Sequence, residues 1–180
     1  LRAVKKAFGA GGVFTFKRAL PESAGSHGAV VFITAETEKA PAGMKDKTLV
    51  LRPREFVVGI GCKRGVTAKE ISAAFNEILD KAGVSKLSVR NLASIEMKKD
   101  EKGLLSFARR MGLDIEFFTP GELNSVRPPS GGSRLVREKT GAAGVCEPSA
   151  LLSTGARRIW VKKIKTGRVT TAMARAPFTS

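Results

Sequence analysis

A short glycine-rich segment between an apolar run and a helical pattern carries the residues best suited to holding an anion. The segment 59–65 reads GIGCKRG. Glycines let a ligand or a neighbouring backbone pass close, amides at a helix start point outward, and basic side chains add charge. A tight turn packed against a neighbour is the alternative. The residues expected to form the anion site are Gly59, Gly61, Cys62, Lys63, Arg64 and Gly65.

The same segment does not fit the common nucleotide motifs. Its spacing, G-x-G-x-x-x-G, is one residue longer than the dinucleotide fingerprint. The next strand ends in VRNLAS, without the acidic residue that would hold a ribose, and no G-K-[ST] follows at P-loop spacing. A nucleotide site is therefore disfavoured, and an anion site of a general kind remains.

A second polar segment, residues 96–101, follows the next expected strand. Because loops after parallel strands meet at one edge of a sheet, we expect this segment beside the glycine-rich turn. His27, the only histidine, lies far away in the sequence, which excludes a Ser-His-Asp triad or a histidine metal site in the main domain. Acid–base chemistry would fall on Glu96, Lys98 and Glu101, and ordinary capping or surface ion pairing is the alternative.

Three further residues complete the expected ligand-binding set: Ser94 at the end of the second strand, and Glu147 and Ser149 at the start of a later helix. Cys62 lies close to a helix start and to two basic residues, which we expect to lower its pKa. A small buried residue in the turn is the favoured role for Cys62, and a nucleophile is the alternative.

Apolar periodicity and turn residues predict the elements that must position these groups. Strands are expected at 56–60, 86–92, 114–119, 158–163 and 168–174. Helices are expected at 67–82, after a Thr67–Glu70 capping box, and at 100–111, 119–123, 133–140 and 147–154. This alternation predicts an α/β fold with a mostly parallel sheet of about five strands, helices on both faces and an antiparallel C-terminal strand pair, preceded by a partial α/β segment.

The charge balance favours an anionic partner. The chain has 32 Lys and Arg against 16 Asp and Glu, a net charge of +16. Such an excess attracts nucleic acid, an anionic membrane or a small polycarboxylate, or it is a solvated surface. With no Tyr and one Trp, stacking platforms for RNA or DNA are scarce. No stretch reaches the roughly 18 apolar residues of a membrane span, and the isolated Cys62 and Cys146 favour the cytoplasm.

Five segments, in order, resemble the C-terminal domain of the cobalamin-biosynthesis CbiG proteins, which the stand-alone CobE proteins share. They read LRPREFVVGIGCKRGVTAKEI, LASIEMKKDEKGLLSFARRMGL, FFTPGEL, GAAGVCEPSALL and VKK…TTAMARA. The resemblance runs from Leu51 to Ala176, and the run G-I-G-C-[KR]-R-G is its most specific part.

The resemblance implies an activity and a substrate. CbiG proteins are assigned as cobalt-precorrin-5A hydrolases, which open a lactone and release acetaldehyde during corrin ring contraction. Their substrate carries acetate and propionate arms and brings its own cobalt, so no metal site or cofactor is expected of the chain. On this interpretation Glu101 or Glu96 is the base, with Lys98 or the amides after Gly61 stabilising the oxyanion. The family usually has Asp where this chain has Glu96.

The resemblance also divides the chain. Residues 51–180 are expected to form the CbiG C-terminal or CobE-like domain, and residues 1–50 the end of a central region with a linker, including a helix at 1–8 and strands at 12–16 and 29–36. Because the chain begins with Leu1, we expect the family's N-terminal domain upstream, and the catalytic groups could equally lie there.

The expected partner is an anionic cobalt-precorrin, with other pathway enzymes as further partners and with neither nucleic acid nor membrane. A non-catalytic, CobE-like corrinoid-binding domain is the first alternative function. A nucleic-acid-binding module, suggested by charge alone, is the remote alternative.

Overall fold

The structure is a computed structural model that describes residues 30–37 and 48–177. The chain divides into two compact units, one made of Leu1–Phe32 and Glu38–Leu51 and the other of Ile33–Thr37 and Arg52–Ser180. Strands β1 (Val30–Ile33) and β2 (Thr48–Leu51) form a two-stranded sheet. The helix expected at 1–8, the strand expected at 12–16 and the loop around His27 lie outside the described residues.

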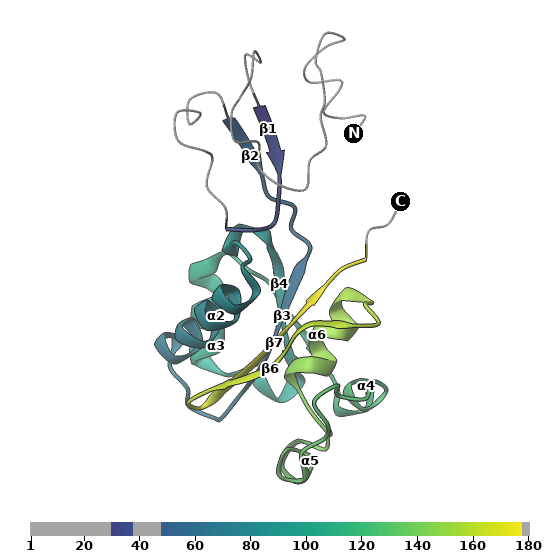
Figure 1. The fold of residues 1–180 in the computed structure, drawn as a ribbon. Coiled ribbons are helices and arrows are strands. Elements are labelled where there is room, and N and C mark those ends of the chain that lie inside the picture. The colour runs from purple at the N-terminus through teal and green to yellow at the C-terminus, as the bar shows by residue number, and fades with distance from the viewer. Residues whose placement is uncertain (1–29, 38–47, 178–180) are drawn as a thin grey trace. The chain divides into compact units, whose positions relative to one another are not determined.

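A five-stranded sheet forms the centre of the larger unit (Figure 1). Its strands are β3 (Phe56–Cys62), β4 (Val89–Ile95), β5 (Ile115–Phe118), β6 (Ile159–Thr166) and β7 (Val169–Arg175), arranged in the order β5-β4-β3-β7-β6. Strands β3, β4 and β5 run parallel to one another, whereas β7 is antiparallel to both β3 and β6. The predicted α/β fold with an antiparallel C-terminal strand pair is therefore confirmed.

Helices cover both faces of this sheet (Figure 1). Helices α2 (Ala68–Ala82) and α3 (Lys102–Met111) pack together on one face, and α6 (Cys146–Thr154) packs on the other against β3, β4 and β7. Two short helices, α4 (Pro120–Asn124) and α5 (Arg134–Thr140), precede α6. Both faces of β3 are thus buried and β4 is largely buried, as expected when crossover helices cover the sheet, whereas the edge strand β5 is only partly covered.

Local sequence signals explain where several helices begin and end. The Thr67–Glu70 capping box at the start of α2 is present, and Gly83 ends that helix at φ +64°. Thr119 and Glu122 form a second capping box around Pro120 at the start of α4. These motifs satisfy the free amides of a helix start through side chains only a few residues away, so they can be predicted from the sequence.

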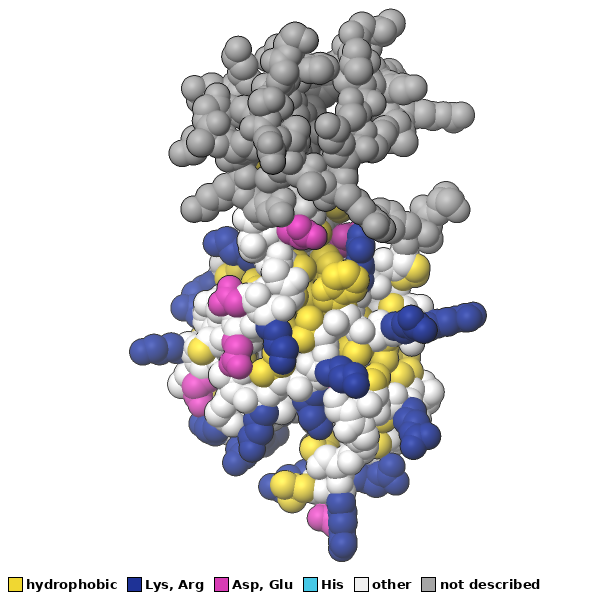
Figure 2. All heavy atoms as spheres, in the orientation of Figure 1, with side chains coloured by type: hydrophobic (Ala, Val, Ile, Leu, Met, Phe, Trp, Pro, Cys, Tyr) yellow, Lys and Arg dark blue, Asp and Glu magenta, His cyan; other side chains and the backbone are white. Residues whose placement is uncertain are grey.

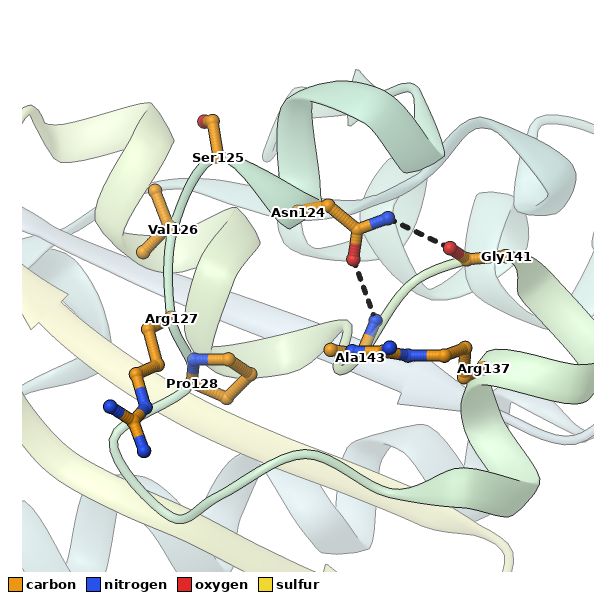
Figure 3. Close-up of a pocket in the computed structure, with 8 residues that line it drawn as sticks. All are labelled: Asn124, Ser125, Val126, Arg127, Pro128, Arg137, Gly141 and Ala143. Atoms are coloured by element: carbon orange, nitrogen blue, oxygen red, sulfur yellow. Dashed lines mark hydrogen bonds between the residues drawn. The ribbon is translucent and has the colours of Figure 1, made fainter.

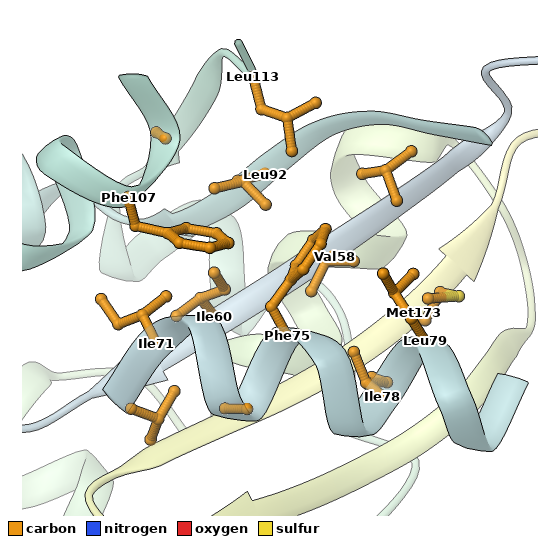
Figure 4. Close-up of a cluster of buried hydrophobic side chains, with 14 of the residues drawn as sticks. Val58, Ile60, Ile71, Phe75, Ile78, Leu79, Leu92, Phe107, Leu113 and Met173 are labelled. Carbon is orange, nitrogen blue, oxygen red and sulfur yellow. The ribbon is translucent and has the colours of Figure 1, made fainter. Parts of the chain in front are cut away.

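The side chains of β3 divide the core between the two faces of the sheet. Phe56, Val58 and Ile60 lie in the large cluster formed with α2 and α3. Figure 4 shows Val58 and Ile60 within it. In that cluster Phe75 and Phe107 meet edge to face, with ring centroids 5.2 Å apart. The alternate positions of β3 face α6, as the two-residue period of a strand requires.

Several expected boundaries differ from the structure. Residues 86–88 form a short 3-10 turn capped by Ser85, and β4 begins only at Val89 and continues to Ile95. Helix α3 begins at Lys102, so Glu101 is its N-cap and not part of its first turn. Helix α6 begins at Cys146, one residue earlier than predicted.

Candidate functional site

The turn after β3 is held by contacts within the fold. The amide of Lys63 donates to the carbonyl of Arg168 at 3.0 Å, and the amide of Gly65 donates to Glu101 Oε1 at 3.0 Å. Arg168 in turn donates to the carbonyls of Arg64, at 2.6 Å, and Gly65, at 3.3 Å. Since two of the turn's amides are already bonded, an anion at this turn would meet charged side chains more than backbone N–H groups.

The expected meeting of two loops at one sheet edge is present in the structure. Lys98 Nζ lies 3.3 Å from Glu101 Oε2, while Oε1 of the same carboxylate accepts the bond from Gly65. The side chains of Lys98 and Glu101 are only 13% and 7% exposed. One buried carboxylate therefore joins the turn after β3 to the segment after β4.

An outer layer of charged side chains surrounds this buried pair. Arg64 lies 3.9 Å from Asp100, and Lys99 lies 4.0 Å from Glu96. Such long, exposed ion pairs contribute little to stability, because water and salt screen them. Their side chains can turn toward a charged ligand at small cost. Figure 2 shows Lys and Arg side chains spread widely over the visible face of the molecule.

The pKa of the Cys62 thiol differs from the expected one. Burial raises the pKa of its thiol to about 11, and the charge of Lys98 opposes this shift only in part. The expectation that nearby basic residues would lower this pKa was wrong, because the half-buried thiol loses more hydration than the charges restore. At neutral pH Cys62 is a protonated thiol, which is a poor nucleophile.

Gly59 and Gly61 lack side chains because neighbouring segments pass close to them. A Cβ on Gly59 would lie 1.8 Å from the carbonyl oxygen of Cys146, at the start of α6. A Cβ on Gly61 would lie 2.7 Å from Thr170 Oγ1 and 3.5 Å from Val145 Cβ. Of the two reasons predicted for these glycines, a ligand or a neighbouring backbone, the structure provides the backbone at Gly59.

The remaining three expected ligand-binding residues are buried and hydrogen-bonded. Ser94 Oγ donates to the carbonyl of Ile60 at 2.7 Å, and Ser149 Oγ donates to carbonyls of Ala93 and Cys146. Glu147 is 1% exposed; it accepts bonds from Ser130 N and Oγ and from Lys163 N, at 3.0, 2.6 and 3.0 Å. Ser94 therefore joins β4 to β3, whereas Ser149 and Glu147 hold α6 to β4, to the loop at Ser130 and to β6.

Two residues that the sequence did not single out shape the site. Arg168 holds the turn carbonyls and also lies 3.7 Å from Glu70. Gly103 lets α3 approach the start of α2, since a Cβ there would lie 1.9 Å from the carbonyl oxygen of Val66. Gly103 could have been noticed in the sequence, because a glycine in the first turn of a helix is unusual and indicates a close approach. Arg168 gave no signal, because its position depends on the pairing of β7 with β3.

Within residues 30–37 and 48–177, no group of three or more His, Cys, Asp or Glu side chains is placed to hold a metal ion. None of the helices that the structure describes is both long enough and apolar enough to cross a membrane.

Fold and site together define an α/β domain with a charged edge at the carboxyl ends of its parallel strands, where ligands of open α/β sheets bind. The sequence model of the family described as "Cobalamin synthesis G C-terminus" matches residues 56–174. The chain belongs to this family and thus to cobalamin biosynthesis.

Relatives and solved structures agree with this assignment. The chain is 36% identical over 157 residues to a protein of Priestia megaterium named "Cobalt-precorrin-5A hydrolase", covering 86% of this chain and 41% of that protein. It is 29% identical over 143 residues to "Protein CobE" of a Sinorhizobium species, covering 78% of this chain and 85% of that protein. The crystal structure of CobE superposes with a TM-score of 0.65 at 30% identity, covering 71% of this chain and 94% of CobE. The chain therefore spans less than half of the hydrolase it resembles and most of CobE.

Proposed function

We propose that this chain is the C-terminal part of a cobalt-precorrin-5A hydrolase and that it binds the anionic macrocycle at the carboxyl ends of β3 and β4. The observation that carries the proposal is the buried Lys98–Glu101 pair, which joins two loops and places exposed basic side chains around them. Lys63, Arg64 and Lys99 would meet the acetate and propionate arms. The proposal puts the reaction in the cytoplasm, in keeping with free Cys62 and Cys146.

We propose different roles for the two acids, Glu96 and Glu101. Both oxygens of Glu101 are engaged, by Gly65 N and Lys98 Nζ, and its side chain is 7% exposed. Glu96 is more open, at 38% exposed, with only a 4.0 Å ion pair to Lys99. In the proposed reaction Glu96 takes the proton from the water that attacks the lactone carbonyl, and Glu101 is a positioning residue. The Lys98 ammonium faces the developing oxyanion.

A non-catalytic corrinoid-binding domain is the second candidate function. It is favoured by the match to CobE, of which this chain covers 85%. The hydrolase and the binding domain differ in whether acetaldehyde is released. If the chain supplies the catalytic groups, adding it to cobalt-precorrin-5A releases acetaldehyde, and Glu96→Gln abolishes that release without loss of binding. Binding without acetaldehyde from the unaltered chain would support the binding domain instead.

The site itself is tested by comparing three lysine variants of equal charge change. Lys63→Gln and Lys98→Gln are expected to weaken cobalt-precorrin binding by roughly 1–3 kcal/mol each, since each removes a charge-assisted hydrogen bond. The control, Lys81→Gln, changes an exposed residue at the far end of α2, about 20 Å along the helix from its start.

Affinity is read from the visible absorption of the corrinoid, and the melting temperature is measured in parallel because Lys98 also neutralises the buried Glu101. Equal weakening by Lys63→Gln and Lys81→Gln would mean that diffuse charge, and not this edge, holds the ligand.

A further inference from the structure

A cavity between α4 and α5 lies outside the edge described above (Figure 3). Its volume is about 470 Å³, within the range of small-molecule sites. One wall is the end of α4 with residues 125–128, and the other is formed by α5 and residues 141–143.

Asn124 fixes the two walls relative to each other. Its Nδ2 donates to the carbonyl of Gly141 at 2.8 Å, and its Oδ1 accepts from the amide of Ala143 at 2.9 Å (Figure 3). The carbonyl at the end of α5 and the nearby amide are thus bonded to this side chain. A ligand in the cavity would therefore form its hydrogen bonds mainly with side chains.

The loop beneath the cavity is also held. A Cβ on Gly144 would lie 3.0 Å from Pro128 Cγ, so the two segments pack closely. Two residues after Pro128, Ser130 bonds through both its amide and its hydroxyl to the buried carboxylate of Glu147. The cavity is consequently pre-formed by packing and hydrogen bonds, which lowers the entropy cost of binding.

Two arginines give the cavity its charge. Arg127 and Arg137 are exposed and lie on opposite sides of Pro128 (Figure 3). Among the described residues neither guanidinium forms an ion pair or a hydrogen bond. None of the described residues that line the cavity is acidic. Each guanidinium keeps its donors for a ligand, and two positive charges without a counter-ion favour an anion.

The chain connects this cavity directly to the edge of the sheet. Ala143 lines the cavity, and Val145, two residues later, lies beside Gly61 at the end of β3. Two residues span at most about 7 Å. An extended ligand bound over the end of β3 would therefore have its periphery near the two arginines.

We propose that the Arg127–Arg137 cavity binds a carboxylate group. The planar guanidinium fork matches the two oxygens of a carboxylate and can form two parallel hydrogen bonds. The origin of this carboxylate rests on the proposed function: it would be an acetate or propionate arm of the macrocycle. A small free dicarboxylate would use the same contacts.

The test compares two double variants of the whole chain that each remove two positive charges. Arg127→Gln with Arg137→Gln alters the cavity. Arg109→Gln with Arg110→Gln alters exposed arginines on α3, which packs on the opposite face of the sheet. The probes are cobyrinic acid, a corrin whose arms end in free carboxylates, glutarate and inorganic phosphate. Affinity for the corrin is measured by visible absorption, stabilisation by the small anions as a shift in melting temperature, and folding by circular dichroism.

We expect the cavity variant to bind cobyrinic acid about tenfold or more weakly and the α3 variant to change less than twofold. Equal weakening by the two variants overturns the proposal, as does equal stabilisation of the unaltered chain by phosphate and glutarate.

The same measurements distinguish a failure of the proposed function from a failure of the carboxylate site. If the unaltered chain binds no corrin, a glutarate-induced rise in melting temperature that only the cavity variant loses still supports a carboxylate site. If the chain binds no corrin and glutarate gives no such difference, the cavity is not a carboxylate site.

Discussion

At the scale of single residues, burial decides the chemistry of the site more than neighbouring charge does. Cys62 has Lys98 and Arg168 close by, yet burial raises the pKa of its thiol to about 11. Glu101 is likewise surrounded by its own partners, and both its oxygens are engaged. The exposed basic residues around this pair are therefore free to meet the arms of a ligand, and of the pair itself only the Lys98 ammonium is proposed to face the substrate.

The thiol of Cys62 is expected to react only in strong base. In the Cys146→Ala variant, where Cys62 is the single thiol, the rate of alkylation by iodoacetamide should rise with a midpoint near pH 11, against a midpoint near the ordinary value of 9.0 in urea. Because the thiol ionises later in the folded state, its contribution to stability is present below pH 9 and is lost as the pH rises toward 11. A midpoint below 9 in the folded protein would instead indicate an activated nucleophile.

At the scale of elements, the close approach of α6 to β3 fixes the geometry of the sheet edge. The carbonyl of Cys146 occupies the space where a side chain on residue 59 would lie. Ser149 then bonds to Ala93 on β4, and Glu147 holds the chain at Ser130 and at Lys163. Helix α6 thereby places Val145, and with it the Arg127–Arg137 cavity, beside the end of β3.

Gly59→Ala is expected to destabilise the protein by about 2–4 kcal/mol, because the new methyl group can be accommodated only by moving α6 away from β3. Gly121→Ala is the matched control. Its Cβ would meet only Thr119 Oγ1, at 3.9 Å, and alanine favours the helix at that position. Unfolding in urea measures both variants, and equal midpoints would show that α6 does not approach β3 this closely.

At the scale of the whole molecule, a net charge of +16 favours the approach of anionic molecules. Charge of one sign raises the local concentration of any anion, whatever its structure. Specific binding then depends on which basic side chains lack internal partners and on which segments carry them. Among residues 30–37 and 48–177, Arg127 and Arg137 have no such partner, and Arg64 and Lys99 are paired only loosely with acids.

The affinity for a polycarboxylate corrin is expected to fall several-fold as ionic strength rises from about 0.05 M to 0.5 M, since screening shortens the reach of exposed charges. Isothermal titration at a series of salt concentrations measures this. The control is a gel shift with mixed RNA and DNA at moderate salt, where no stable complex is expected. An affinity independent of salt, or a nucleic-acid complex that survives where no corrin binds, would contradict a polycarboxylate ligand.

Local signals in the sequence predicted most of the helices and strands. They also predicted the family, which the comparisons confirm. The Thr67–Glu70 capping box, the glycine stop at Gly83 and the strand periodicity of β3 each depend on residues within one or two turns of one another. Such interactions leave a pattern in any sequence window, because their geometry is set by the backbone of one segment. The meeting of the two loops after β3 and β4 could also be predicted, since parallel strands bring their carboxyl ends to one edge.

Tertiary structure alone decided which of these residues are available to a ligand. The placement of β7 beside β3 brings Arg168 onto the turn, and the packing of α6 buries Glu147 and Ser149. The tertiary structure also forms the Arg127–Arg137 cavity, from segments that carry no recognisable motif. Burial and hydrogen bonding between distant segments depend on strand order and helix packing, which involve residues tens of positions apart. The sequence shows residue types and their local spacing, whereas the exposure and the pKa of each group follow from which distant segments surround it.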